Sequence, residues 1–136
     1  MHYWINTISK DHVMLGVAAG FTQANHGKPH MIKRLKKGDW IIFYSPKTSY
    51  KDGESLQAFT AIGQVKDDEL YQTTTPEGRM PWRRNMTFYN CVETSIKPLI
   101  DDLNFITNKT NWGFRFHLGM FEIGQEDFDL LKKAMT

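Results

Sequence analysis

The sequence predicts a small α/β domain of the α+β type, in which a curved and largely antiparallel sheet closes toward a barrel. Three observations support this prediction. Short runs rich in aromatic and β-branched residues recur between turn residues, which gives five to six strands. Other segments repeat apolar residues at helical spacing, which adds two or three flanking short helices. No repeat or linker divides the chain, so we expect a single domain over residues 1–136.

The first third of the chain predicts a strand, a helix and a second strand. Residues 3–8 are aromatic and β-branched, as is typical of a strand. Ser9 can cap the helix that follows, and Gly20 can end it because glycine accepts a positive φ. One face of this helix is expected to be buried: Val13, Met14, Val17 and Ala18. The apolar run 40–44 is typical of a central strand that is covered on both faces.

The rest of the chain predicts strands, a loop and two helices. Gly63, inside a strand over 56–65, marks a bulge or a close approach of two backbones. Residues 72–81 are a loop, and Pro98 begins a short helix. The remaining predicted elements are strands at 85–93, 114–118 and 120–123 and a terminal helix at 125–135.

Composition argues against several classes of protein. The single cysteine, Cys91, excludes an internal disulfide and fits a reducing, cytoplasmic compartment. The chain opens directly on a strand-like run, so we expect no signal peptide, and no apolar stretch approaches the ~20 residues that a membrane span needs. We find no phosphate-binding or dinucleotide-binding glycine motif and no metal-binding histidine motif. We therefore expect no cofactor, no metal and no catalytic residues.

The segment 20–28 is the strongest functional signal. After Gly20 it presents one aromatic ring, Phe21, and several side chains that can hydrogen-bond, with no apolar run to bury them. The polar side chains that we expect to contact the edge of a ligand are Thr22, Gln23 and Asn25. A flat, hydrogen-bonding heterocycle such as a nucleobase fits this combination.

Charge is distributed unevenly along the chain. Residues 1–51 hold eight Lys or Arg against two acids, and five of the ten residues from 28 to 37 are basic. We expect this stretch to form a face toward phosphates, and we assign phosphate contacts to Lys33, Arg34 and Lys36. An ordinary solvated surface is the alternative.

Trp82 lies in a predicted loop beside Arg83 and Arg84. A tryptophan among arginines can form a stacking wall with phosphate contacts beside it, although packing on the edge of the domain is an equal alternative. Arg115 is expected on the face opposite two phenylalanines, as a phosphate contact or a plain surface residue. Trp4 can face either the core or a cleft.

The chain resembles the EVE domain of the PUA-like superfamily, in its small bacterial branch. The motifs that carry the resemblance are Tyr3–Asn6, Gly20–Lys28, Lys37–Trp40 with Phe43–Ser45, and Phe121–Ile123. The resemblance spans essentially the whole chain and implies a PUA-like pseudo-barrel. It also implies kinship with YTH domains, which bind a methylated adenine of RNA in an aromatic cage.

The resemblance further implies roles for particular residues. Phe21 resembles the cage aromatic, where YTH domains have Trp, and Trp82 resembles the second wall. Asn6 lies where the first strand supplies a polar contact, and Tyr44 and Ser45 end the strand beneath the pocket.

These considerations predict a non-enzymatic module that binds RNA or DNA and captures a base, most simply a modified one, between Phe21 and Trp82. Two alternatives stay open. One is a hydrolase acting on RNA or a nucleoside, like the ASCH-type relatives, with Asn25, His26 or His117 as acid–base groups. The other is a sensor of a free nucleoside. The sequence does not decide the oligomeric state.

Overall fold

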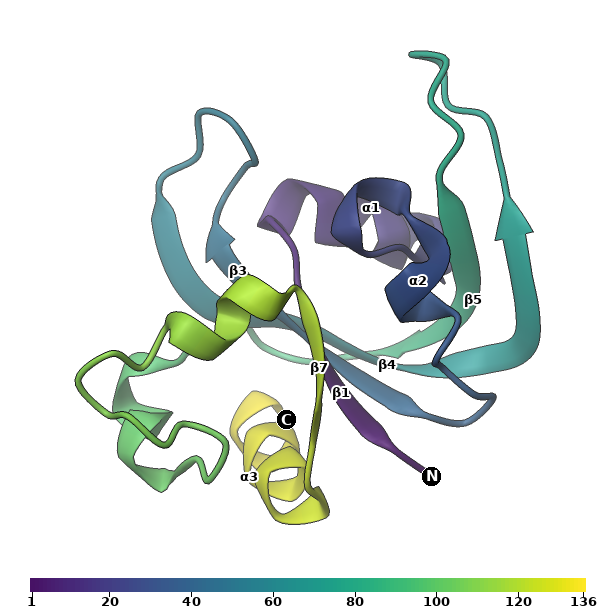
Figure 1. Cartoon of the computed structure of the whole chain (residues 1–136). Helices are drawn as coiled ribbons and strands as arrows, with labels where there is room; N and C mark the ends of the chain where they lie inside the picture. The colour runs from purple at the N-terminus through teal and green to yellow at the C-terminus, as the bar shows by residue number, and fades with distance from the viewer.

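The computed structural model describes all residues, 1–136, as a curved sheet with helices on both faces (Figure 1). The strands are β1 (Tyr3–Thr7), β2 (Phe21–Thr22), β3 (Trp40–Lys47), β4 (Ser55–Gln72), β5 (Trp82–Tyr89), β6 (Thr94–Ser95) and β7 (Met120–Ile123). The α-helices are α1 (Lys10–Ala19), α2 (Pro29–Ile32) and α3 (Gln125–Met135), and the 3-10 helices are η1 (Asn25–Gly27), η2 (Lys97–Asp102) and η3 (Phe114–Leu118). The predicted α+β class is confirmed, with seven strands instead of five or six. No helix has the length and apolar character needed to cross a membrane.

The strand order is β2-β5-β4-β3-β1-β7, and β6 pairs with β4 outside this path. All pairings are antiparallel except that of β1 with β3, where Tyr3 lies opposite Trp40 and Thr7 opposite Tyr44. A parallel pair needs a long crossover, and here α1, β2 and α2 form it. The crossover therefore carries the segment 20–28 over one face of the sheet.

Two apolar clusters lie on opposite faces of the central strands. Successive residues alternate between them: Ile42 and Tyr44 belong to the first cluster, whereas Ile41 and Phe43 belong to the second. We call the first side, covered by α3, the closed face. We call the second side, covered by α1 and α2, the cleft face. Burial on both sides explains why β3 reads as a continuous apolar run.

Helix α1 ends at Gly20, as predicted, with a φ of 78°. The prediction of its buried face was wrong at three of four positions, because only Val13 and Gly16 are buried. Leu15 is 63% exposed. The helix therefore packs over the sheet through few residues. At Gly16 it lies so close to β2 that an added Cβ would be 2.5 Å from the carbonyl oxygen of Phe21.

The predicted strand at 114–118 is a 3-10 helix, η3. The alternation of Phe114, Phe116 and Leu118 imitates a strand, but the amide of Phe116 bonds to the carbonyl of Gly113 and that of Gly119 to Phe116. Gly119, at φ 79°, then turns the chain into β7. Only Phe116 of the three is buried.

Strand β4 is longer than predicted and includes the charged residues 66–69, which bulge out of its pairing with β5. Gly63 marks a close approach, as expected, since a Cβ there would lie 2.7 Å from the carbonyl oxygen of Thr87. The β3–β4 and β4–β5 connections both project beyond α1 on the cleft face (Figure 1). These two loops flank the site described next.

Candidate functional site

A cleft of about 1490 Å³ opens on the cleft face. Its walls come from α1, the segment from β2 to α2, and the β3–β4 and β4–β5 loops, and η3 closes one end. The volume exceeds the roughly 300–1,000 Å³ of a typical small-molecule site. The cleft is therefore larger than one small molecule needs.

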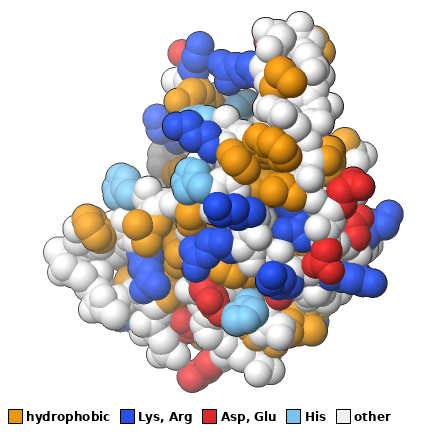
Figure 2. Space-filling model, turned by 45° about the vertical axis from the view of Figure 1, so that its right-hand side comes forward, with side chains coloured by type: hydrophobic (Ala, Val, Ile, Leu, Met, Phe, Trp, Pro, Cys, Tyr) orange, Lys and Arg blue, Asp and Glu red, His pale blue; other side chains and the backbone are white.

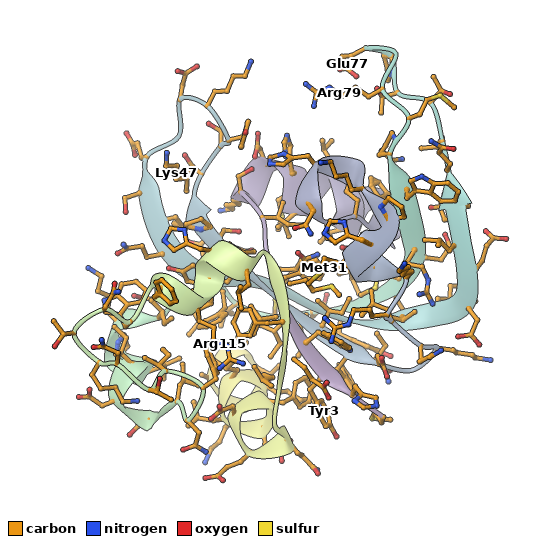
Figure 3. All side chains as sticks on the ribbon, viewed as in Figure 1. Tyr3, Met31, Lys47, Glu77, Arg79 and Arg115 are labelled. Carbon is orange, nitrogen blue, oxygen red and sulfur yellow. The ribbon has the colours of Figure 1, made fainter.

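Positive charge dominates the cleft. Four cations line it: Lys28, Lys47, Arg79 and Arg83. Glu77 is the only acidic residue in the lining. Figure 3 places Lys47 on one loop and Glu77 and Arg79 at the tip of the other, and Figure 2 shows Lys, Arg and His side chains spread over this side of the molecule.

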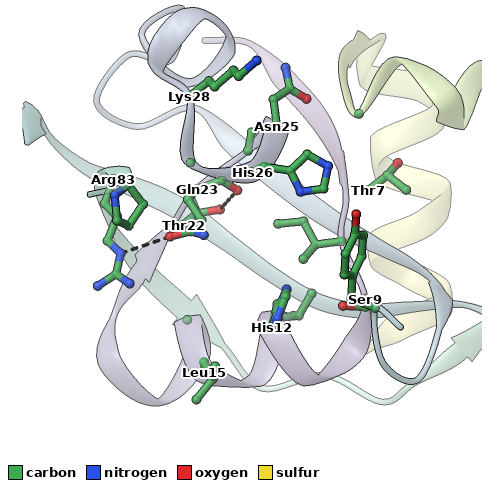
Figure 4. Close-up of a pocket in the computed structure, with 18 of the residues that line it drawn as sticks. Thr7, Ser9, His12, Leu15, Thr22, Gln23, Asn25, His26, Lys28 and Arg83 are labelled. Atoms are coloured by element: carbon green, nitrogen blue, oxygen red, sulfur yellow. Dashed lines mark hydrogen bonds between the residues drawn. The ribbon is translucent and has the colours of Figure 1, made fainter. Parts of the chain in front are cut away.

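Four of the five histidines also line the cleft: His12, His26, His30 and His117. His12 and His26 point into the same space between α1 and η1 (Figure 4). Tyr50 of the β3–β4 loop meets both, with ring centroids 6.4 Å from His12 and 5.4 Å from His26. Three rings from three elements thus gather at the mouth of the cleft.

The chain between β2 and α2 bends through three successive left-handed residues, with φ of 49° at Asn25, 57° at His26 and 86° at Gly27. Such a conformation costs energy in residues other than glycine, and it recurs at functional sites. The environment fixes it. A Cβ on Gly27 would lie 2.6 Å from the Pro81 side chain. The side-chain nitrogen Nδ2 of Asn25 lies 2.9 Å from Nε2 of His30.

Beneath the cleft, Asn6 anchors β2 to β1. Its side-chain nitrogen donates to the hydroxyl of Thr22 at 3.3 Å and to the carbonyl of Gln23 at 3.1 Å. The Oδ1 of Asn6 and the hydroxyl of Thr7 are buried without a partner. Asn6 is 1% exposed and lies under the floor, whereas Thr7 and Thr22 line it.

Phe21 and Trp82 both line the cleft, but they do not form the predicted sandwich. Arg83 covers the ring of Phe21, with its Cζ 3.7 Å from the ring centroid. Trp82 and Arg83 are neighbours in β5, so their side chains leave opposite faces of that strand. Trp82 is half-buried: it packs against the second apolar cluster and also lines the cleft.

Three of the predicted ligand contacts belong to the core. Trp4 is 3% exposed, and its indole nitrogen donates to Asp39 at 3.1 Å. Tyr44 stacks on Phe116 in the closed face, at 4.0 Å between centroids, and burial raises the pKa of its hydroxyl. Ser45 is fully buried and bonds to the hydroxyl of Thr60. None of the three lines the cleft.

Arg84 is not a phosphate contact, contrary to the prediction. It is 2% exposed, and its guanidinium donates to the carbonyl oxygens of Ile32, Leu35 and Asp67 at 3.0, 2.6 and 2.9 Å. Desolvation lowers its pKa, although a guanidinium keeps its charge at neutral pH. Arg84 therefore ties the turn after α2 to the sheet.

The other predicted phosphate contacts lie outside the cleft. Lys33, Arg34 and Lys36 are exposed on the turn after α2, where the guanidinium of Arg34 lies over the ring of Trp4 at 4.9 Å. Arg115 lies over the ring of Phe121 at 5.1 Å, next to a separate small hollow near the start of α3. Figure 3 shows Arg115 on the α3 side of the molecule, away from the two loops.

The sequence did not single out His12, Lys47 or Tyr50 as site residues. His12 belongs to α1, whereas Lys47 and Tyr50 lie at the end of β3 and in the loop that follows it, and no local pattern distinguishes them. No three His, Cys, Asp or Glu side chains are grouped closely enough to hold a metal ion. The lining of the cleft combines aromatic and hydrogen-bonding side chains with an excess of positive charge.

The EVE domain model matches residues 2–134. The chain belongs to the EVE domain family. Within it the chain is similar to UPF0310 proteins, with 58% identity to one from Mycolicibacterium vanbaalenii over all of this chain and 94% of the relative. The UPF0310 protein YdcG of Bacillus subtilis is 38% identical, over 98% of this chain and 92% of the relative.

Solved structures confirm the fold of this EVE domain. The protein Rpa0253 from Rhodopseudomonas palustris matches with a TM-score of 0.59 and 14% identity, over 98% of this chain and 92% of that one. The protein Atu2648 from Agrobacterium tumefaciens matches with a TM-score of 0.56 and 12% identity, over 98% and 93%. At this level of identity the likeness concerns the fold alone.

Proposed function

We propose that this EVE domain is a non-enzymatic module that binds RNA or DNA and captures one base, most simply a modified base, in the cleft. The observation that carries the proposal is the composition of the cleft. Ring surfaces, amide and hydroxyl groups, four cations and four histidines line one space that contains a single acid. Stacking surfaces combined with positive charge are the usual means of holding an unpaired nucleotide.

The edge of the base meets the segment between β2 and α2. Thr22, Gln23 and Asn25 supply donors and acceptors there, with Thr22 held from below by Asn6. Trp82 and Tyr50 supply rings on the two sides of the cleft. Because residues 25–27 are held in a left-handed conformation, Asn25 is positioned before a ligand arrives.

The phosphates of the captured nucleotide meet Lys28, Lys47 and Arg79 at the rim of the cleft. Neighbouring nucleotides leave past Lys28 toward the exposed Lys33, Arg34 and Lys36. These contacts add affinity without sequence preference, since phosphates are the same at every position.

A binding screen tests the proposal. Fluorescence anisotropy is measured with single-stranded and duplex oligonucleotides of RNA and DNA that differ only in one methylated or hydroxymethylated base. We expect one modified base to bind more tightly than its unmodified parent. Trp82→Ala should remove that preference while leaving the weak affinity for unmodified strands, since base stacking is worth ~1–3 kcal/mol. The absence of binding by every oligonucleotide would refute the proposal.

The same assay separates the two alternatives. A sensor saturates with the free nucleoside alone, whereas a polymer-binding module needs the flanking phosphates. A hydrolase converts its substrate, so product after a long incubation with modified nucleosides and RNA would identify one. The histidines at the cleft make this control necessary.

A further inference from the structure

The guanidinium of Arg83, on the neighbouring strand, lies over the ring of Phe21. Its Cζ lies 3.7 Å from the centroid of the Phe21 ring, well within the ~6 Å of a cation–π contact. Its Nε also donates to Oε1 of Gln23 at 3.1 Å (Figure 4). Both contacts join β5 to β2 and its extension, so the orientation of the guanidinium is fixed by two independent partners.

This arrangement changes what Phe21 can offer a ligand. A base that stacked on the same face of the ring would have to displace Arg83 and break its hydrogen bond to Gln23. A guanidinium plane is itself a surface on which bases stack. Arg83 is only half-buried and lines the cleft, so it can present this plane to a ligand.

The charged side chains that share the cleft with Arg83 are mainly positive. Lys28, Lys47 and Arg79 share the cleft with it, and Glu77 is the only acid. Hydrogen bonds from its own backbone amide and from Thr75 lower the pKa of Glu77, so it is ionised at neutral pH. Glu77 lies at the tip of the β4–β5 loop beside Arg79, where Figure 3 shows both. A cationic base would therefore meet several like charges and only one carboxylate, which is exposed and already accepts hydrogen bonds.

We propose that the cleft selects a neutral base, stacked on the plane of Arg83, and rejects bases that ring alkylation has made cationic. This inference rests on the proposed function, because it concerns the ligand of the same cleft. It assigns Arg83 to the base and removes it from the predicted phosphate contacts. It also restricts the modified bases in question to those that carry their substituent without a positive charge.

Isomeric bases give a direct test. N6-methyladenine is neutral and 1-methyladenine is cationic at pH 7, and N4-methylcytosine and 3-methylcytosine form a second such pair. Each base is placed at one position of the same single-stranded oligonucleotide, and dissociation constants are measured by anisotropy. We expect the cationic isomer to bind at least about tenfold more weakly in both pairs, because stacking on a guanidinium then opposes two positive charges.

Three variants locate the effect. Arg83→Gln should narrow the difference between isomers to less than about threefold, whereas Arg79→Gln removes the same charge from the same cleft and should preserve it. Arg83→Lys keeps the charge but loses the plane, so it should weaken binding of the neutral isomer and still reject the cationic one. Thermal melting of each variant confirms that it is folded.

The outcomes are distinguishable. Tight binding of a modified strand with equal affinity for both isomers overturns this inference and leaves the proposed function standing. The same holds if Arg79→Gln narrows the difference as much as Arg83→Gln. If no oligonucleotide binds at all, the proposed function fails and this inference fails with it.

Discussion

The two faces of the central sheet are built from the same strands but differ in how they are packed. On the closed face, aromatic rings from β3, β4, η3 and β7 pack with α3 into fifteen buried apolar residues. On the cleft face, eleven buried apolar residues share the space with polar groups such as Asn6, Asp39 and Arg84. The larger apolar core therefore lies on the closed face, and the cleft face combines a smaller core with a polar cleft.

The largest effect is expected on the closed face. Leu131 of α3 is fully buried, so Leu131→Ala should lower the free energy of unfolding by about 2–5 kcal/mol through lost burial and a residual cavity. Chemical denaturation measures this. Leu15→Ala on the cleft face is the matched control, and it should change stability by less than about 0.5 kcal/mol because Leu15 is exposed. Equal losses in the two variants would contradict the division between the faces.

The second effect concerns the polar support of the cleft face. Arg84→Leu should cost about 2–4 kcal/mol, because three carbonyl oxygens on the turn after α2 and on β4 lose their donor. Hydrogen exchange should show faster exchange of the amides of α2 and the turn that follows it. Asn85→Ala, next to Arg84 in β5, removes one half-buried hydrogen bond to Asp67 of β4 and is the milder comparison. An Arg84→Leu protein as stable as the wild type would show that the carbonyls find other partners.

Removing positive charge should change nucleic-acid binding, and it should do so on the cleft face but not beside the closed face. The double variant Lys33→Ala with Arg34→Ala should weaken binding to all oligonucleotides about tenfold and lower the slope of log K against log salt by about 2. Lys132→Ala with Lys133→Ala removes the same charge from α3, beside the closed face, and should leave the slope unchanged. A fall of the same size in both variants would mean that only net charge matters.

The smallest expected effect concerns the rate at which the Cys91 thiol is alkylated. Cys91 packs half-buried against the closed-face cluster, and burial raises the pKa of its thiol. Less of it is thiolate at pH 8 than in an unfolded chain, so iodoacetamide should alkylate it several-fold more slowly in the native protein than in denaturant. Raising the pH should speed the reaction. Equal rates in both states would indicate that the closed face opens readily near β6.

The sequence predicted the closed face better than the cleft face. The stripe of Phe128, Leu131 and Met135 in α3 and the continuous apolar run of β3 are local patterns, and the structure buries both as expected. In α1 the same kind of pattern failed, because the helix faces the sheet through Val13 and Gly16, and Met14 and Val17 stay 37% exposed. A periodicity indicates which residues share a face, but not whether another element covers it.

The cleft could be predicted where its residues are consecutive. Thr22, Gln23 and Asn25 lie together because they follow one another in the chain. Arg83 and Arg84 look alike in the sequence, and only the assignment of 82–89 to a strand separates them, since alternate residues then face opposite sides. Tyr50 reaches His12 and His26 through a hairpin loop, a relation that no spacing in the sequence encodes.

The parallel pairing of β1 with β3 has a consequence for synthesis of the protein. Strand β1 leaves the ribosome well before its second neighbour, β7, at residues 120–123. Tyr3 also packs on Phe128 of α3, with ring centroids 4.5 Å apart. One edge of β1 therefore has no partner until residues 120–123 have been translated, and an unpaired strand edge can pair with another chain in the meantime.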